Sequence, residues 1–414
     1  MEAVDVLVVG AGPAGSTTAF RLAERGWNVL VLEEHGRVGQ PVQCAGLVSQ
    51  RVIDLAGSTS MVRAAVHGAT VFGPGLGSLS FRADEPRAFV IDRAALDVHL
   101  SDRAARAGAT FRTGARFDRR LSMMDGREVV RVVESDGTVR EISARLVVGA
   151  DGVSSAVARA YRLRRPVEIL PAFEAEIPRS PGDPDAVEVF LGRRFAPGLF
   201  GWWIPDGTGG ARVGLAADAD GVSARTYFTH LMNHLARRFG SPFASPTAYI
   251  VSGIPIGEVP ATHAAHVLLV GDAAAQVKPL SGGGIYTGMR CAEIAAAVAA
   301  SALERNDLSD RVLAEYDRAW RAEFGEEFRR ALYLRRLFTR LSDGDLDALI
   351  EVLRSAELRA TIVAFGDIDF PTHVVRQLLR ESPSLVRLLP KALGAWVGSV
   401  SYRVPDLEPG PRRK

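Results

Sequence analysis

The glycine-rich segment Gly10–Gly15, which reads Gly-Ala-Gly-Pro-Ala-Gly, constrains the fold of this chain more than any other feature. It directly follows an apolar run from Val4 to Val9, and such a run is typical of a strand buried on both faces of a parallel sheet. A helix is predicted from Ala14 to Arg25. In a strand–turn–helix unit the three glycines allow, in order, a tight turn, close approach of the backbone to a pyrophosphate, and close packing of the helix on the strand. The segment therefore predicts an α/β fold that binds a dinucleotide.

An acidic residue at the expected distance supports this interpretation. The second apolar run, Val29 to Leu32, ends at Glu33. An acid about 20 residues beyond the first glycine accepts hydrogen bonds from ribose hydroxyls. A carboxylate there would repel a 2′-phosphate, which argues against NADP in this pocket. A glycine-rich turn without a ligand is the alternative for the glycines taken alone.

Two later segments add further contact points for the same ligand. Gly149-Ala150-Asp151-Gly152 follows the apolar strand predicted at 145–149, and Gly271-Asp272 follows another at 267–270. A turn rich in glycine comes next, at 279–285. The order and spacing of the three patches predict one flavin adenine dinucleotide (FAD), contacted at three places. The alternative for Asp151 and Asp272 is that they cap turns.

Composition excludes several other classes of function. Among 414 residues, 50 are basic and 48 acidic, and no basic stripe calls for nucleic acid. The two cysteines, Cys44 and Cys291, are not in a CxxC motif, which fits a reducing cytoplasm. No run of 18 apolar residues predicts a membrane span, and the first strand begins too early for a signal peptide. His230 and His234 lack acidic or thiol partners nearby in the sequence, so no metal site is predicted.

The cofactor patches alternate with a segment of β character, which predicts two interleaved domains. Residues 167–255 alternate apolar and polar positions, as antiparallel strands do, with one helix predicted from Thr226 to Phe239. The predicted fold is α/β: a Rossmann-like FAD-binding domain, an antiparallel β-sheet substrate domain and a helical C-terminal region. The predicted ranges are 1–66, 92–160 and 261–300 for the FAD-binding domain, 67–91 and 161–260 for the substrate domain, and 301–414 for the helical region.

With these three patches the sequence resembles the superfamily of FAD enzymes that includes p-hydroxybenzoate hydroxylase. The resemblance implies that the segment 149–152 lies near the cofactor pyrophosphate and that Asp272 lies on its ribitol and pyrophosphate side. It implies that the turn at 282–284 begins a helix aimed at the flavin pyrimidine, where a helix N-terminus stabilises negative charge. Arg93 matches an arginine that members of the superfamily place on the cofactor.

Three other segments resemble the geranylgeranyl reductase family, which saturates C=C bonds of isoprenoid chains. They are Val38–Gly46, Pro197–Pro205 and Phe365–Pro371. The family pattern PxxYxWxFP is matched at both prolines of the second segment and at Trp202, with Phe200 in place of Tyr and Ile204 in place of Phe. The departure at position 200 removes one polar group from the expected substrate tunnel.

The resemblance also implies roles for individual side chains. Cys44 would lie close to the flavin, where it could contact the ring or relay a proton; the alternative is a small thiol chosen for packing. Phe200, Trp202, Trp203 and Ile204 would line a groove for a prenyl chain. Trp202 and Trp203 point to opposite faces of a strand, so only one can face the groove, and the motif favours Trp202.

Together, the motifs and the resemblance predict a catalytic set and a cofactor-binding set of residues. The catalytic residues are Cys44, Phe200 and Trp202. The cofactor-binding residues are Gly10, Gly12, Pro13, Ala14, Gly15, Glu33, Glu34, Cys44, Ala45, Gly46, Arg93, Asp151, Gly152, Gly271, Asp272, Gly282, Gly283, Gly284 and Ile285.

Three rival functions were weighed against a prenyl reductase. Flavin-dependent halogenases carry a WxWxIP pattern, which the segment 200–205 approaches, but they depend on a lysine in the N-terminal part of the chain. Here the first lysine is Lys278, which disfavours halogenation. Aromatic hydroxylation stays open because the fold is shared. A non-enzymatic flavin-binding protein would have no use for the aromatic segment.

The substrate, electron donor and location follow from the same resemblance. The substrate class is a hydrophobic prenylated molecule: a lipid, a chlorophyll precursor or a quinone. The sequence shows no second dinucleotide fold, so NADPH would bind transiently or a ferredoxin-like protein would donate electrons. A cytoplasmic protein is expected. Arginines beside apolar residues of Leu385–Trp396 suggest peripheral contact with a membrane, and ordinary packing helices are the alternative.

Overall fold

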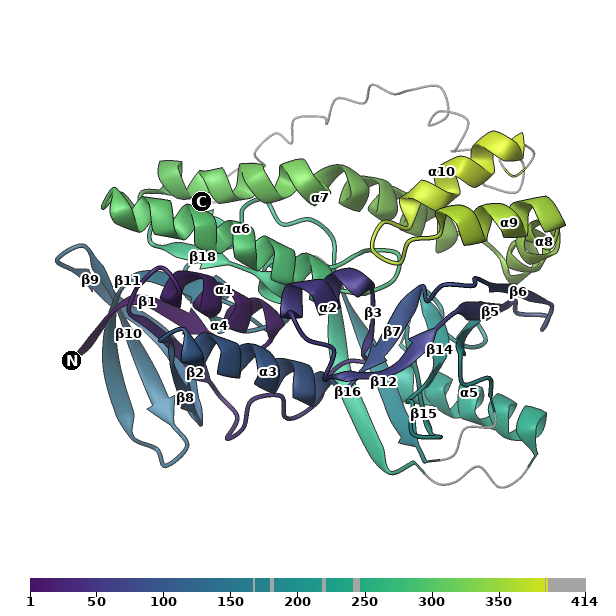
Figure 1. Cartoon of the computed structure of the whole chain (residues 1–414), viewed down its shortest axis with the longest axis horizontal. Helices are drawn as coiled ribbons and strands as arrows, with labels where there is room; N and C mark the ends of the chain where they lie inside the picture. The colour runs from purple at the N-terminus through teal and green to yellow at the C-terminus, as the bar shows by residue number, and fades with distance from the viewer. Residues whose placement is uncertain (167, 179–181, 218–220, 241–245, 384, 386–414) are drawn as a thin grey trace.

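The computed structural model describes residues 1–166, 168–178, 182–217, 221–240, 246–383 and 385. Two large sheets stand at opposite ends of the molecule, and long helices run along one side of it (Figure 1). The mixed α/β architecture is the predicted one.

The first sheet has eight strands, and its centre is parallel. The neighbouring strands β18, β11, β1, β2 and β8 all run in the same direction. Apolar side chains fill them because helices or further strands cover both faces, as the alternation-free sequence of β1 predicted. Strands β9, β10 and β17 extend the sheet in the antiparallel direction. The bounds are β1 Glu2–Val9, β2 Val29–Glu33, β8 Thr110–Thr113, β9 Ala115–Met124, β10 Arg127–Glu134, β11 Val139–Gly149, β17 His263–Ala264 and β18 Val267–Leu269.

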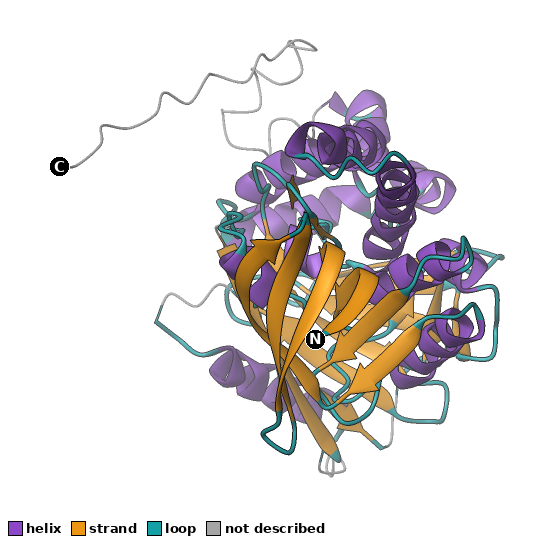
Figure 2. Ribbon diagram, turned by 90° about the vertical axis from the view of Figure 1, so that its left-hand side faces the viewer, coloured by secondary structure: helices purple, strands orange, loops and turns teal. Residues whose placement is uncertain are grey.

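Helices cover this sheet and bury its apolar face, as Figure 2 shows beside the orange strands. The core on the helical side contains residues of α1, α6 and α7, among them the fully buried Tyr316 and Phe324. The short helix α4 packs on the other face. The bounds are α1 Pro13–Ala23, α3 Arg93–Arg106, α4 Ala156–Ala160, α6 Ile285–Glu304 and α7 Asp310–Phe338, with a 3-10 turn η1 at Gly271–Ala274.

The second sheet has seven strands in the order β16-β12-β15-β14-β13-β5-β6. All its pairs are antiparallel except β13 with β5, which join 186–190 to 68–72 in parallel. This pair links two segments that are far apart in the sequence, as the interleaved organisation predicted. Helix α5 packs on one face through a core that includes Trp203 and Leu231. The bounds are β5 Gly68–Phe72, β6 Ser78–Arg82, β12 Glu168–Ile177, β13 Ala186–Phe190, β14 Phe200–Pro205, β15 Ala211–Ala216, β16 Ala248–Ile256 and α5 Ala224–Phe239.

A small third sheet divides the segment 67–91 that the sequence assigned to one domain. Strand β7 pairs with β3 and β4 in a three-stranded sheet, whereas β5 and β6 belong to the seven-stranded sheet. Helix α2 follows β3. The bounds are β3 Leu47–Val48, β4 Val62–Val66, β7 Ala88–Ile91 and α2 Gln50–Ala56.

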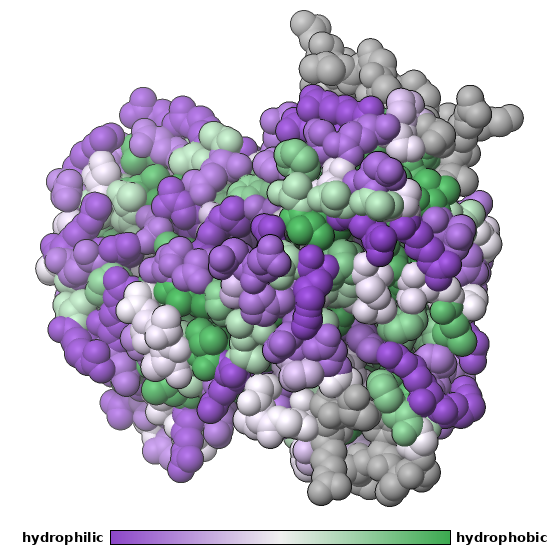
Figure 3. Space-filling model, turned by 45° about the vertical axis from the view of Figure 1, so that its right-hand side comes forward, coloured by the Kyte–Doolittle hydropathy of each residue, from purple (hydrophilic) through white to green (hydrophobic). Residues whose placement is uncertain are grey.

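The C-terminal region is helical, with α8 at Asp343–Leu353, α9 at Ala356–Phe365 and α10 at Thr372–Glu381. Helix α10 ends at Glu381, directly before Ser382-Pro383. Among the described residues, no helix is both long and apolar enough to span a membrane. Figure 3 shows hydrophilic side chains over much of one face, with apolar patches scattered between them. Of the segment Leu385–Trp396, all but Leu385 lies outside the described residues.

Candidate active site

One cavity of about 820 Å³ brings the predicted site together. It lies where β1, β2, η1 and the N-termini of α1 and α6 face strands of the seven-stranded sheet. Every predicted cofactor or catalytic residue lines it, with the exception of Gly15. The three glycine patches and the aromatic strand β14 therefore share one space.

Gly15 has a packing role instead of a place on the cavity wall. It is buried in α1, and a Cβ at this position would collide with the carbonyl oxygen of Gly10. Gly10 itself has φ +104° and lies against the backbone of Ala150. Its missing side chain lets α1 lie directly on the turn after β1, and its place among the cofactor contacts stays a prediction.

The N-terminus of α1 opens into the cavity. Its N-cap, Gly12, provides no side-chain hydrogen bond, and no atom lies within 4 Å of where a Cβ would stand. The first N–H groups of the helix are therefore left for a ligand, and their partial positive charge suits a pyrophosphate.

Glu33 supports the turn as well as lining the cavity. Its Oε2 accepts a hydrogen bond from the Ala11 backbone N–H at 3.1 Å. Its Oε1 accepts one from the His35 backbone N–H at 3.0 Å and lies 2.7 Å from His35 Nδ1. A carboxylate has about four acceptor positions, so hydroxyl groups of a ribose can still be accommodated.

Asp151 uses its carboxylate to cap a helix. Oδ1 accepts from the Ser155 hydroxyl at 2.6 Å, and Oδ2 accepts from the backbone N–H groups of Ala156 and Val157 at 2.6 and 3.0 Å. The capping alternative raised by the sequence thus describes this side chain. Its neighbour Gly152 offers an open approach, because no atom lies within 4 Å of its Cβ position.

Asp272 differs from Asp151, because its carboxylate accepts no hydrogen bond among the described residues. Burial raises its pKa to about 6, while the positive charge of Arg93 opposes the rise. The Oδ1 atom lies close to Gly284, the N-cap of α6, which has no side-chain cap of its own. An acceptor and a free helix N-terminus thus meet at this end of the cavity.

Arg93 is held at the cavity by a buried acid on its own helix. Its Nη2 lies 3.1 Å from both oxygens of Asp97, one turn further along α3. The guanidinium also faces the Cys44 thiol. The pair therefore carries a fixed positive group to the position that the superfamily resemblance implied.

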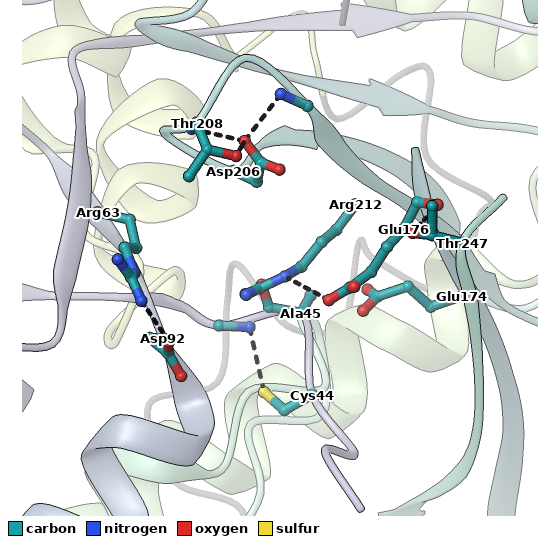
Figure 4. Close-up of polar contacts among 12 residues, drawn as sticks. Cys44, Ala45, Arg63, Asp92, Glu174, Glu176, Asp206, Thr208, Arg212 and Thr247 are labelled. Atoms are coloured by element: carbon teal, nitrogen blue, oxygen red, sulfur yellow. Dashed lines mark hydrogen bonds and ion pairs between the residues drawn. The ribbon is translucent and has the colours of Figure 1, made fainter. Parts of the chain in front are cut away.

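Cys44 lies on a loop whose backbone accepts a hydrogen bond from Arg212. The sulfur accepts a hydrogen bond from the Gly46 N–H at 3.4 Å. Arg212, which lies beside Ala45 in Figure 4, donates from Nη1 to the Ala45 carbonyl at 2.8 Å. The same nitrogen donates to the Ile91 carbonyl at 3.1 Å. A side chain from the seven-stranded sheet thus holds the Cys44 loop against the cavity.

Strand β14 forms an aromatic wall, and its two tryptophans separate as alternation requires. Trp202 lines the cavity and meets the Phe200 ring edge-on, with centroids 6.3 Å apart. Trp203 is fully buried on the opposite face and packs near Phe239 of α5. The structure thus places Trp202, and not Trp203, on the site.

Sequence reasoning missed Glu174, a carboxyl in the same wall. Its side chain is buried, at 3% exposure, and lines the cavity. Oε2 accepts a hydrogen bond from Trp202 Nε1 at 2.7 Å. Burial raises its pKa to about 7, although the Trp202 hydrogen bond and the charge of Arg212 oppose the rise. In the sequence it is one polar residue in an alternating strand, and nothing local marks it.

Sequence reasoning also missed an ion-pair chain at the glycine turn. Lys278 Nζ donates to Asp369 Oδ1 at 2.8 Å and to the Ile368 carbonyl at 2.7 Å. Asp369 and Asp367 both bind Arg51 of α2. These contacts explain the segment Phe365–Pro371: it connects α9 to α10 and places Ile368 and Pro371 on the cavity wall.

The residues fit FAD on structural grounds. Two helix N-termini without side-chain caps, those of α1 and α6, open into one cavity. Glu33, the acid expected to bind the ribose, ends β2 and accepts a hydrogen bond from the glycine turn. Anionic phosphates and the electron-rich pyrimidine end of a flavin both suit helix N-termini.

Comparison with known proteins agrees with this fit. Residues 3–327 match the FAD binding domain family. Digeranylgeranylglycerophospholipid reductase 2 of Methanopyrus kandleri is 34% identical over 92% of this chain and 98% of its own length. The namesake from Methanothermobacter thermautotrophicus is 32% identical over 93% and 98%. The chain belongs to the geranylgeranyl reductase family.

A solved structure supports the same membership. A geranylgeranyl bacteriochlorophyll reductase-like protein from Thermoplasma acidophilum superposes with a TM-score of 0.80 at 25% identity, covering 93% of this chain and all of the other. As a member of the geranylgeranyl reductase family, this chain is an FAD-dependent oxidoreductase.

Proposed function

We propose that this enzyme saturates C=C bonds in the geranylgeranyl chains of a glycerophospholipid. The proposal is supported by the printed activity of relatives that match nearly the whole chain. The observation that carries it is the shared cavity, in which the flavin-binding motifs face an apolar wall.

That wall suits an isoprenoid chain. The seven-stranded sheet contributes mostly apolar side chains to the cavity, and each buried methylene of a ligand gains about 0.8 kcal/mol. The apolar residues of these strands on the cavity are Ala172, Val187, Val189, Phe200, Trp202, Ile204, Ile250 and Ile254.

The residues of the chain align the alkene with the flavin and exclude water from the site of reduction. When bound and reduced, the flavin supplies a hydride. An isolated alkene is a poor acceptor, so the wall of β14 must hold it aligned and free of water. Cys44 and Arg93 lie next to each other on the wall of the same cavity. The role of Cys44 as a contact or proton relay stays a prediction.

The test is anaerobic flavin reoxidation. Holoenzyme is reduced with dithionite and mixed with digeranylgeranylglycerophospholipid, while a parallel sample receives the same lipid with saturated chains. We expect the oxidised flavin spectrum to return only with the unsaturated lipid. Reoxidation that required oxygen in both samples would contradict the proposal and favour a monooxygenase.

We further propose that electrons arrive from transiently bound NADPH or from a ferredoxin-like protein. The proposal rests on the single dinucleotide motif, Gly10–Gly15, whose acid Glu33 disfavours NADP in that pocket. Anaerobic bleaching of the flavin by each donor tests it. Failure of both to bleach the flavin would contradict it.

A cytoplasmic location with peripheral membrane contact completes the proposal. It is supported by the lipid substrate and by the arginine-flanked apolar residues of Leu385–Trp396. Flotation with anionic liposomes tests the contact: the protein should float with the vesicles, and its retention at the bottom of the gradient would contradict the proposal.

A further inference from the structure

We propose that Glu174 is the general acid that protonates the substrate carbon during double-bond reduction. The inference rests on the reductase function proposed above and assigns the group that delivers the second hydrogen. Glu174 lies on the cavity wall beside Trp202, within the apolar surface that would hold the prenyl chain.

The sheet register builds this position. Glu174 of β12 pairs with Gly214 of β15, and Gly214 pairs with Trp202 of β14, so the three residues form one row. A Cβ on Gly214 would stand 2.6–2.8 Å from the Trp202 indole, including its Nε1. The glycine therefore lets the indole lie across β15 and reach the carboxyl.

The hydrogen bond determines where the acid proton resides. Trp202 Nε1 is only a donor, so Oε2 of Glu174 must accept. In the neutral carboxyl the proton then belongs on Oε1. That atom is buried and has no hydrogen-bond partner among the described residues. The proton is thus left without a protein acceptor, next to the cavity.

The surroundings let this carboxyl keep its proton up to about pH 7. Burial in the apolar wall raises its pKa to about 7, and the neighbouring Glu176 adds to the rise, while Trp202 and Arg212 oppose it. Figure 4 shows Glu176 paired with Arg212, at 3.8 Å, and the Glu174 carboxyl next to that of Glu176. A general acid works best when its pKa lies near the working pH.

Glu188, a second acid of the seven-stranded sheet at the cavity, turns its carboxyl to the opposite face, in register with Trp203. Glu188 of β13 binds both terminal nitrogens of Arg238 from α5, at 2.6 and 2.8 Å. Such a bidentate pair fixes the Glu188 carboxyl against α5. Glu174 has no bidentate arginine of this kind among the described residues, which distinguishes it as the acid of the wall.

The proposed step balances. The π bond of the alkene breaks; one carbon receives the hydride with its electron pair from the reduced flavin, and the other receives the proton of Glu174. Two C–H bonds form and the flavin is oxidised by two electrons. The Glu174 carboxylate regains its proton from water before the next turnover.

The experiment compares three variants of the holoenzyme in anaerobic single turnover with digeranylgeranylglycerophospholipid. Glu174→Gln keeps size and hydrogen bonding but has no acidic proton, Glu174→Asp keeps the acid on a shorter arm, and Glu176→Gln is the control. Glu176 is on the same strand, 44% exposed at its side chain, and does not line the cavity. The FAD spectrum confirms that each variant is folded and loaded.

We expect Glu174→Gln to slow flavin reoxidation by the lipid about 100-fold or more, as for loss of a general acid. Glu176→Gln should keep most of the wild-type rate at low pH and should keep the pH dependence, with its midpoint moved to lower pH because the Glu176 charge adds to the rise in the Glu174 pKa. The wild-type rate should fall as pH rises through about 7, because the carboxyl ionises. Glu174→Asp should retain a pH-dependent limb that Glu174→Gln lacks. If Glu174 had a purely structural role, the fall in rate with rising pH would persist in Glu174→Gln.

Two other outcomes are separable. If the wild type reduced the lipid and Glu174→Gln matched it in rate and pH profile, Glu174 would not be the acid. If the wild type itself reduced no double bond, the proposed function would fail and this inference with it.

Discussion

At the scale of single residues, burial and charge partners decide which acids of the cavity can carry a proton. Asp97 is paired with Arg93 and Glu188 with Arg238, so each carboxylate has a cation beside it. Glu174 is buried without such a pair, and its pKa rises to about 7. Among the acids that line the cavity, Asp97 and Glu188 thus each bind an arginine, whereas Glu174 has no such ion pair among the described residues.

The raised pKa of Glu174 makes stability depend on pH. In the unfolded chain the group ionises near 4.5, but in the folded protein it does so near 7. The folded state therefore loses stability as pH rises between these values. From about pH 5 to about pH 8, wild type should lose about 2 kcal/mol of unfolding free energy relative to Glu174→Gln.

Denaturant unfolding of both proteins at the two pH values measures this difference. Glu176→Gln serves as the control and should keep the loss of stability with rising pH, reduced in size because the Glu176 charge adds to the rise in the Glu174 pKa. Parallel curves for wild type and Glu174→Gln would show that the carboxyl is not ionising across this range.

At the scale of elements, local features such as a glycine turn were predictable from the sequence, whereas the side chains that meet across neighbouring strands were not. Local glycine spacing predicted the turn Gly10–Gly15, and the alternation of side chains predicted which tryptophan of β14 faces the site. Glu174 gains its role only from the register that places β12, β15 and β14 side by side. Spacing alone also could not separate Gly15, which packs, from Gly12, which opens into the cavity.

Gly214 gives a prediction at this scale. In Gly214→Ala the added methyl would stand 2.6–2.8 Å from atoms of the Trp202 indole, well inside van der Waals contact. The indole must shift, so we expect loss of its hydrogen bond to Glu174 and destabilisation of about 1–3 kcal/mol. Thermal unfolding and single-turnover rates measure both effects.

Gly36→Ala is the control, because no atom lies within 4 Å of its Cβ position. It should behave as wild type. An unchanged rate and stability in Gly214→Ala would mean that the row of three residues is not held as described.

At the scale of the whole molecule, distant segments meet at the glycine turn before α6. Lys278 and Asp369 are 91 positions apart, and Arg51 adds a third element, α2. The family resemblance pointed to Phe365–Pro371 as a unit, but only the fold shows that its acids bind Lys278 and Arg51. Such contacts depend on chain topology and leave no periodic signal in the sequence.

Asp369→Asn should loosen this junction. Asp369 is almost fully buried, and removing its charge leaves Lys278 buried without its counter-ion, so we expect a cost of about 3 kcal/mol and faster FAD release. Asp367→Asn, at a side chain 25% exposed, should cost about 1 kcal/mol. Thermal unfolding measures the loss of stability in each variant, and FAD retention on dilution measures the release of the cofactor. Equal effects of the two substitutions would contradict a structural role for the buried Lys278–Asp369 pair.

The central claim is that one cavity joins the flavin to a prenyl chain for reduction. The mass of the lipid after anaerobic turnover with reduced holoenzyme tests it most directly. The account predicts a gain of two hydrogens for each double bond reduced, with no added oxygen. A lipid of unchanged mass, while the flavin reoxidises only when oxygen is admitted, would contradict it.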